Sequence, residues 1–347
     1  MSKSVVRKLK DAHEGADRIL ILLHDHPDPD AMASALALRA VLGRNKQTAT
    51  IGHFGADVSR PENVAMADLL EIDVTPLATE QVSDFDSIAM VDVQPPYFGD
   101  LFPRVDSVID HHPKTGKYKA VFSRISPSEG ATSTIMTGLL RASDIEISER
   151  LATALLYGIK TDTFSLTRDA DDDDVEAFTF LYKKANLGLL RKIEKAEIPS
   201  DELTVFGRSL ARHRIRNNVL FINLGKVTRE YMIPKMADFC MQAKDVEWVV
   251  SFGILNDVYF IASLRNVGYV KSAGKVARSI FQMFGPPGGG NAGKQNGEAV
   301  RGGGGGHRSA AKVVIPMKEM KKHLGGVSQA KISKWISDTV IERIGDG

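Results

Sequence analysis

The chain is poor in cysteine, since Cys240 is the only one in 347 residues. A single cysteine cannot form an intramolecular disulfide, which excludes a small secreted disulfide scaffold and favours a reducing, cytoplasmic location. Apolar runs are also short, and none approaches the roughly 18 residues of a membrane-spanning helix. The first residues contain no apolar segment of the kind found in secretory signals. We therefore expect a cytoplasmic protein without membrane segments.

An excess of one charge sign is also missing. Lys and Arg number 45 and Asp and Glu number 43, so the formal net charge is only +2. Such a chain offers no strong field to a long polyanion, and any phosphate must bind at a local site. The hydrophobic share of 43% and the charged share of 25% are typical of globular proteins. The length exceeds the roughly 250 to 300 residues of a single core and predicts two domains.

Short apolar runs alternate with helical patterns in the first half of the chain. Runs at residues 19–23, 48–54, 87–91 and 107–109 predict strands, and residues 31–42, 131–142 and 148–160 predict helices. Strands that alternate with helices indicate βαβ units. We therefore expect an α/β domain with a mostly parallel sheet flanked by helices.

The second half has a different pattern. Residues 187–196 and 201–213 predict a helical connector, and strands are predicted at 219–224, 248–255 and 258–264. Asn256 and Asp257 separate the last two runs and indicate a tight hairpin turn. We expect a smaller α/β domain with a mixed sheet. Eleven of the 30 glycines fall between residues 285 and 306, a density typical of a flexible linker or of a loop that approaches a ligand closely.

The richest polar motif, residues 24–30 (HDHPDPD), directly follows the first predicted strand. In parallel sheets, ligands bind outside the carboxyl ends of the strands. His24, Asp28 and Asp30 would lie there, and imidazole with carboxylates is a ligand set for transition metals. The alternative is a polar loop in which an aspartate caps the following helix.

Three further polar groups follow predicted elements. Asp92 follows the run at 87–91, the triplet Asp110, His111 and His112 follows the run at 107–109, and Asp162 lies near the end of a helix. Consecutive ionisable residues at the end of a buried strand are costly unless they are paired or bind a metal. Each group alone is ordinary, but together they predict one acidic and histidine-rich site.

These motifs, in this order, resemble those of the DHH phosphoesterase superfamily, which is named for the triplet at residues 110–112. The second half resembles the DHH-associated C-terminal domain through Arg265 and the stretch Gly304, Gly305, Gly306 and His307. The resemblance covers nearly the whole chain. It implies a catalytic domain over 1–188, a connector over 189–213 and a substrate-binding domain over 214–347, with the active site in the cleft between the domains.

The resemblance also implies two divalent metal ions, usually Mn²⁺. His24 and Asp28 would bind the first ion, whereas Asp30, His111 and Asp162 would bind the second. Asp92 would bridge the two ions, His112 would contact the substrate phosphate, and Asp110 would support the two histidines. The substrate would bind to Arg265, Gly304, Gly305, Gly306 and His307. A hydroxide activated by both ions would be the nucleophile.

By this resemblance the chain is a phosphoesterase of the compact two-domain branch, a nanoRNase and pAp phosphatase. Such an enzyme degrades oligoribonucleotides a few residues long and removes the 3′-phosphate of 3′-phosphoadenosine 5′-phosphate. The alternatives are hydrolysis of cyclic di-AMP or linear pApA, hydrolysis of polyphosphate or pyrophosphate, and nucleotide sensing without turnover. A homodimer is a further expectation.

Two local features complete the predictions. Lys312 follows Ala310 and Ala311 where the family usually has glycine, so we expect altered substrate contacts there. The acidic run at 169–174 lacks the glycine and closing glutamate of a calcium loop, and it predicts the solvated start of a helix.

Overall fold

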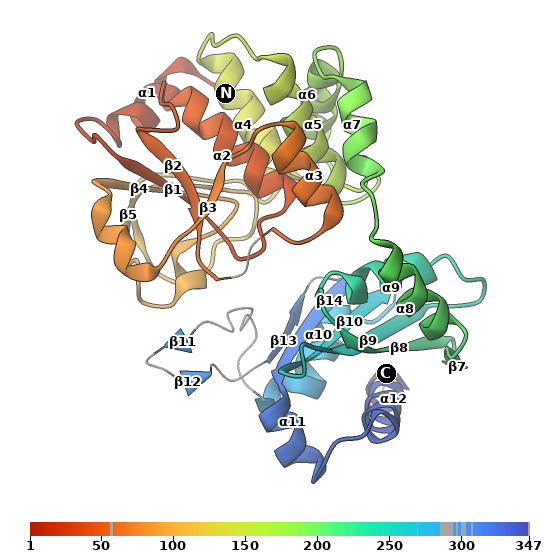
Figure 1. Cartoon of the computed structure of the whole chain (residues 1–347). Helices are drawn as coiled ribbons and strands as arrows, with labels where there is room; N and C mark the ends of the chain where they lie inside the picture. The colour runs from red at the N-terminus through yellow and green to blue at the C-terminus, as the bar shows by residue number, and fades with distance from the viewer. Residues whose placement is uncertain are drawn as a thin grey trace. The chain divides into compact units, whose positions relative to one another are not determined.

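A computed structural model describes residues 1–55, 58–268, 270–284 and 308–345, with short strands at 294–295, 298–299 and 303–306. The chain forms two compact units, Met1–Glu197 and Ile198–Gly347 (Figure 1). The finer division at residues 188 and 213 stays a prediction. None of the helices in the described part of the chain combines the length and the apolarity that a membrane span requires.

The first unit is built on a six-stranded sheet in which every neighbouring pair of strands is parallel. The strand order is β3-β2-β1-β4-β5-β6. The strands are β1 (Ile19–Leu23), β2 (Ala49–His53), β3 (Val74–Pro76), β4 (Ser87–Val91), β5 (Arg104–Asp110) and β6 (Lys119–Ile125). The helices are α1 (Lys3–Asp11), α2 (Pro29–Val41), α3 (Pro61–Leu69), α4 (Thr132–Ala142), α5 (Glu149–Asp162), α6 (Asp172–Tyr182) and α7 (Leu187–Glu194). The predicted parallel sheet flanked by helices is confirmed.

Strand β1 shows why the apolar runs form the centre of this sheet. All five of its residues are buried. Ile19, Ile21 and Leu23 pack into one core, whereas Leu20 and Leu22 pack into a second core on the other face. A strand covered on both faces must be apolar at every position, and this requirement explains the continuous run.

The direction in which the chain adds strands to the sheet changes between β1 and β4. The chain proceeds outward from β1 to β2 and β3 and then returns to β4 on the other side of β1. Loops that leave β1 and β4 therefore diverge to opposite sides, which is the arrangement that creates ligand sites in open α/β sheets. The loop after β1 contains His24, and the residue after β4 is Asp92.

The second unit contains a six-stranded mixed sheet of order β13-β14-β10-β9-β8-β7. Only β8 and β9 pair in parallel; the other neighbours are antiparallel. The strands are β7 (Arg214–Arg216), β8 (Val219–Val227), β9 (Trp248–Leu255), β10 (Tyr259–Asn266), β13 (Gly303–Gly306) and β14 (Ala310–Pro316), and a separate pair is formed by β11 (Lys294–Gln295) and β12 (Glu298–Ala299). The helices are α8 (Ser200–Leu210), α9 (Met232–Cys240), α10 (Ala273–Phe281), α11 (Met317–Leu324) and α12 (Gln329–Gly345). The predicted mixed sheet is confirmed.

The predicted hairpin in this unit is also confirmed. Asn256 and Asp257 have φ values of 49° and 60°, and the amide of Val258 donates to the carbonyl of Leu255 at 2.9 Å. Two consecutive left-handed residues match the twist of the paired strands, and Asn and Asp tolerate that conformation. The turn therefore joins β9 to β10 as the sequence indicates.

The acidic run at 169–174 corrects one expectation. Helix α6 does begin there, and Asp171 and Asp174 form a reciprocal capping box. Asp174, however, is fully buried rather than solvated. Its carboxylate accepts hydrogen bonds from the amide of Gly130 at 2.7 Å and from the hydroxyl of Thr134 at 2.5 Å. The prediction of a solvated helix start was wrong for Asp174, because these two buried donors take the place of water as its hydrogen-bond partners.

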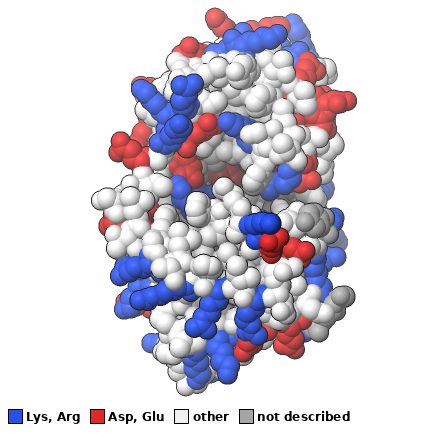
Figure 2. All heavy atoms as spheres, turned by 90° about the vertical axis from the view of Figure 1, so that its right-hand side faces the viewer, with Lys and Arg blue, Asp and Glu red and all other residues white. Residues whose placement is uncertain are grey.

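Both signs of charge are spread over the surface. On the face shown in Figure 2, Lys and Arg side chains occur together with Asp and Glu side chains, and neither sign covers the face alone. This distribution agrees with the small net charge of the chain. Long polyanions bind surfaces of one sign, whereas a small ligand needs only a local site.

Candidate metal centre

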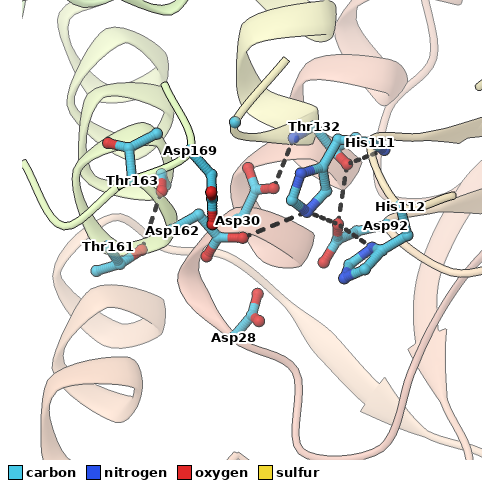
Figure 3. Close-up of polar contacts among 12 residues, drawn as sticks. Asp28, Asp30, Asp92, His111, His112, Thr132, Thr161, Asp162, Thr163 and Asp169 are labelled. Atoms are coloured by element: carbon cyan, nitrogen blue, oxygen red, sulfur yellow. Dashed lines mark hydrogen bonds and ion pairs between the residues drawn. The ribbon is translucent and has the colours of Figure 1, made fainter. Parts of the chain in front are cut away.

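Most of the predicted ligands of the first unit lie close together in Figure 3, which shows Asp28, Asp30, Asp92, His111 and Asp162. Three groups of side chains place their ligand atoms within 4.8 Å of one another, and none of these residues is fully exposed. The groups are His24 with Asp28 and Asp92, Asp30 with His111 and Asp162, and Asp92 with His111 and His112. The structure therefore brings together all the residues that the sequence assigned to a metal site.

Asp92 is the residue that links the groups. Its Oδ2 lies 3.6 Å from Nε2 of His24, whereas its Oδ1 lies 3.6 Å from Nε2 of His111. The residue has a φ of 58°, a left-handed conformation that Asp tolerates better than most residues. Each oxygen of one buried carboxylate thus faces a different group, which is the geometry expected of a bridging ligand.

The two histidines that face Asp92 are oriented by backbone carbonyls. Nδ1 of His24 lies 2.8 Å from the carbonyl oxygen of Asp25, and Nδ1 of His111 lies 3.3 Å from that of Glu129. A ring that donates its Nδ1–H to a carbonyl presents a lone pair at Nε2, the usual arrangement of histidine ligands. Nε2 of His111 is buried and makes no hydrogen bond. Both rings therefore suit a metal ion at Nε2.

His112 is held differently. Its Nδ1 lies 2.9 Å from Oδ1 of Asp110, and the same oxygen accepts its backbone amide at 3.0 Å. Burial opposes the charged ring, but the hydrogen bond to Asp110 and the charge of Asp92 raise the pKa of His112 to about 9. Nδ1 of His112 is therefore directed at a carboxylate, whereas Nδ1 of His24 and of His111 is directed at a backbone carbonyl.

Helix starts position two of the carboxylates. Asp28 caps α2, since its Oδ1 accepts the amide of Ala31 at 2.9 Å. Asp30 accepts the amides of Thr132 and Ser133, each at 2.7 Å, at the start of α4. The capping reading of the motif is thus confirmed for Asp28, which also lies within reach of His24. Helix N-termini stabilise such negative charges.

The centre carries more negative charge than its surroundings balance. Burial and the neighbouring charge of Asp92 raise the pKa of Asp30 to about 7. Burial, together with the charges of Asp28 and Asp30, raises the pKa of Asp162 well above its usual range. Crowded carboxylates of this kind gain from a nearby cation. The four carboxylates of Asp28, Asp30, Asp92 and Asp162 match the formal charge of two divalent ions.

Three residues with a role in this geometry were missed by the sequence reasoning. Thr132 donates its hydroxyl to Oδ1 of Asp92 at 2.8 Å, and that hydroxyl accepts the amide of His111 at 3.2 Å. Gln94 donates to Oδ2 of Asp110 at 2.7 Å. Gly158 lets α5 approach α4 and α2, because a Cβ there would lie 2.4 Å from Oγ of Ser133 on α4 and 3.1 Å from Cα of Asp30 on α2. Gln94 and Gly158 lie close in sequence to Asp92 and Asp162, whereas Thr132 is near none of the motifs.

The remaining predicted residues belong to the second unit. Arg265 lies on β10, and its Nε donates to Asp238 at 2.5 Å. Gly304, Gly305 and Gly306 form part of β13, in which Gly305 pairs with Lys312 of β14. Lys312 also forms an ion pair with Glu230. His307 lies outside the described residues, and the substrate-binding role of this group stays a prediction.

Comparison with known proteins gives a family match and several relatives. Residues 18–159 match a family described as "DHH family, N-terminal domain". An uncharacterized protein of Methanocaldococcus jannaschii, MJ1633, is 31% identical over 80% of this chain and 58% of its own length. A probable manganese-dependent inorganic pyrophosphatase of Lactobacillus acidophilus is 29% identical over 48% of this chain and 57% of its own length.

Two further similarities bear on function and on fold. The cyclic-di-AMP phosphodiesterase GdpP of Bacillus subtilis is 23% identical over 78% of this chain and 44% of its own length. The chain thus spans less than two thirds of each of these relatives. A crystal structure of an exopolyphosphatase-related protein from Bacteroides fragilis has a TM-score of 0.72, at 17% identity, and covers 99% of this chain and 97% of its own. That likeness shows the fold.

Proposed function

We propose that this chain, whose residues 18–159 match the model of the DHH family N-terminal domain, is a metal-dependent phosphoesterase that hydrolyses short nucleotides. Its first substrates are oligoribonucleotides a few residues long and 3′-phosphoadenosine 5′-phosphate. The observation that carries the proposal is the position of Asp92 between two complete ligand groups. Named relatives that act on pyrophosphate and on cyclic di-AMP support phosphate-ester or anhydride chemistry.

The donor set suits two manganese ions. Each proposed site combines one imidazole with carboxylates, a mixture that favours Mn²⁺ over the all-oxygen environment of Mg²⁺. His24 and Asp28 would hold one ion, Asp30, His111 and Asp162 the other, and Asp92 both. When bound, such a pair supplies an activated water and neutralises charge on phosphoryl oxygens.

The chain's own residues would do the rest of the work. His112 has Nδ1 turned to Asp110, an orientation in which Nε2 of its ring would face a substrate oxygen. Asp110 is fixed in turn by Gln94, which prevents rotation of the pair. Thr132 holds Oδ1 of Asp92, so that the bridging carboxylate keeps one orientation. These contacts support a role of His112 toward the substrate and a role of the other residues in holding it.

A second candidate function is hydrolysis of cyclic di-AMP or of linear pApA. The observation in its favour is the similarity to GdpP, which extends over 78% of this chain. Cleavage of inorganic pyrophosphate or polyphosphate is a third candidate, because the manganese-dependent pyrophosphatases match about half of the chain. All these reactions place a phosphoryl group at the same pair of metal sites, so the substrate must be found by experiment.

The test is product analysis with Mn²⁺ on a panel of substrates. The panel contains RNA of two to five nucleotides, 3′-phosphoadenosine 5′-phosphate, cyclic di-AMP, linear pApA, inorganic pyrophosphate and polyphosphate. We expect turnover of short RNA and of the bisphosphate, and loss of that turnover in Asp92→Ala. Preference for cyclic di-AMP would select the second candidate. Absence of turnover on every substrate by a metal-loaded protein would refute the enzyme and favour a nucleotide sensor.

A further inference from the structure

The turn that follows Asp162 has an unusual backbone. Phe164, Ser165 and Leu166 have φ values of 48°, 59° and 65°, three consecutive left-handed residues without a glycine. The hydroxyl of Thr163 stabilises the turn, because it donates to the carbonyl of Ile159 at 2.6 Å and accepts the amide of Leu166 at 3.0 Å. Strain of this kind is concentrated at functional sites, where the surrounding structure enforces it. The turn begins beside a predicted metal ligand.

This turn brings two planar groups together next to the metal centre. The guanidinium carbon of Arg168 lies 4.1 Å from the centroid of the Phe164 ring. Arg168 also donates from Nη2 to the carbonyl of Asp162 at 2.8 Å, while its Nε makes no hydrogen bond and lies 3.8 Å from a carboxylate oxygen of Asp169. Phe164 itself is 59% exposed. The turn therefore presents an aromatic surface and a cation directly beside Asp162.

A purely structural role accounts for only one part of this arrangement. The bond from Arg168 to the last carbonyl of α5 stabilises the end of that helix. It does not require an aromatic partner, and it leaves most of the Phe164 ring in water. An exposed aromatic ring paired with a guanidinium group is, in contrast, what proteins use to stack nucleobases and to contact the adjacent phosphate.

We propose that Phe164 and Arg168 recognise the nucleotide part of the substrate: a base stacks on Phe164, and Arg168 donates to a phosphate oxygen beside the metal centre. This inference rests on the proposed function and narrows it to substrates that carry a base. Inorganic pyrophosphate and polyphosphate have no ring that Phe164 could stack. The pair therefore distinguishes the nucleotide candidates from the inorganic ones.

The experiment is equilibrium binding to the full chain loaded with Mn²⁺. The protein is titrated with adenosine 5′-monophosphate and, separately, with methylenediphosphonate, a non-hydrolysable analogue of pyrophosphate without a base. Phe164→Ala is compared with Phe164→Trp, which keeps a planar ring, and with Tyr182→Ala, which removes another exposed aromatic from the same unit. We expect Phe164→Ala to weaken nucleotide binding about tenfold, with recovery in Phe164→Trp and a Kd for methylenediphosphonate within about twofold of the wild type.

Three results would overturn the inference. The first is an absence of nucleotide binding to the wild type, and the second is unchanged nucleotide binding in Phe164→Ala. The third is an equal weakening of nucleotide binding and of methylenediphosphonate binding in that variant. Failure of the proposed function gives a different pattern, because the substrate panel would then show no turnover while nucleotide binding still depended on Phe164. Turnover of short RNA together with unchanged binding by Phe164→Ala would refute this inference alone.

Discussion

The two ends of strand β4 bury polar groups in opposite ways. At its amino end, His13 lies 2.7 Å from the hydroxyl of Ser87 and 2.8 Å from that of Ser107, and Ser87 donates to Asp106 at 2.8 Å. At its carboxyl end, Asp92 lies 3.6 Å from each of two histidines, beyond hydrogen-bond distance. The first cluster satisfies itself, whereas the second remains short of positive charge.

The difference separates a structural cluster from a functional one. Burial lowers the pKa of His13 to about 4, so this ring is neutral and needs no counter-charge. At the carboxyl end, burial and the neighbouring charge of Asp92 together raise the pKa of Asp30 to about 7. Polar groups that pair with one another stabilise the fold, and those that repel one another are stabilised by a ligand. Each prediction below alters one side of this comparison.

The largest effect is expected for Asp92→Ala. The change removes the carboxylate that faces both ligand groups. We expect a loss of activity well above the roughly 100-fold that removal of a supporting residue causes, together with loss of Mn²⁺ binding. Because the substitution also removes one repelling charge, the metal-free variant should unfold at a higher temperature than the metal-free wild type. Steady-state kinetics and thermal melts with and without Mn²⁺ test both parts.

Thr132→Val should have the next largest effect. Valine keeps the shape of the side chain but loses the hydroxyl that Asp92 and His111 share. We expect Mn²⁺ affinity to fall by roughly 10- to 100-fold, and Thr132→Ser to retain most of the affinity. Isothermal titration calorimetry with Mn²⁺ measures the affinity of each variant. Equal affinity in the valine and serine variants would show that the hydroxyl does not orient the bridging carboxylate.

These predictions also indicate what the sequence could reveal. The continuous apolar runs marked the buried strands, and the polar groups directly after them marked the site, because the ends of parallel strands share one edge. Thr132 could not be found in this way. Its role depends on a helix start that comes into contact with Asp30 and Asp92 only in the folded chain. The burial of Asp174 likewise depends on Gly130, 44 residues away in the chain.

A smaller effect is expected for Gly158→Ala. The added Cβ would lie 2.4 Å from Oγ of Ser133 on α4 and 3.1 Å from Cα of Asp30 on α2, so α5 must move away from both helices. We expect the free energy of unfolding to fall by about 1 to 3 kcal/mol, with weaker Mn²⁺ binding because Asp162 moves with α5. Gly207→Ala is the matched control, since nothing lies within 4 Å of a Cβ at that helical position. An equal effect of both substitutions would contradict the packing explanation, because an alanine without close contacts stabilises a helix relative to glycine.

The most gradual effect concerns the pH dependence of stability at the amino end of β4. His13 is neutral in the folded state, and its pKa is lowered from 6.5 to about 4. The unfolded state therefore binds a proton first as pH falls, and the stabilisation present above pH 6.5 is lost between pH 6.5 and 4. We expect this residue to contribute about 3 kcal/mol to that loss. Urea unfolding measures the free energy of unfolding of the wild type and of His13→Asn across this pH range. We expect that free energy to fall less steeply with pH in the variant, and identical slopes would contradict the prediction.

The central claim is that the carboxyl end of β4 is completed by cations. Calorimetric titration of the metal-free full chain with Mn²⁺ at neutral pH tests it most directly, with His13→Asn as the matched change at the amino end of the same strand. The account predicts two ions per chain in both proteins and a higher melting temperature after loading. Absence of saturable binding, or a stoichiometry that depends on His13 rather than on Asp92, would contradict it.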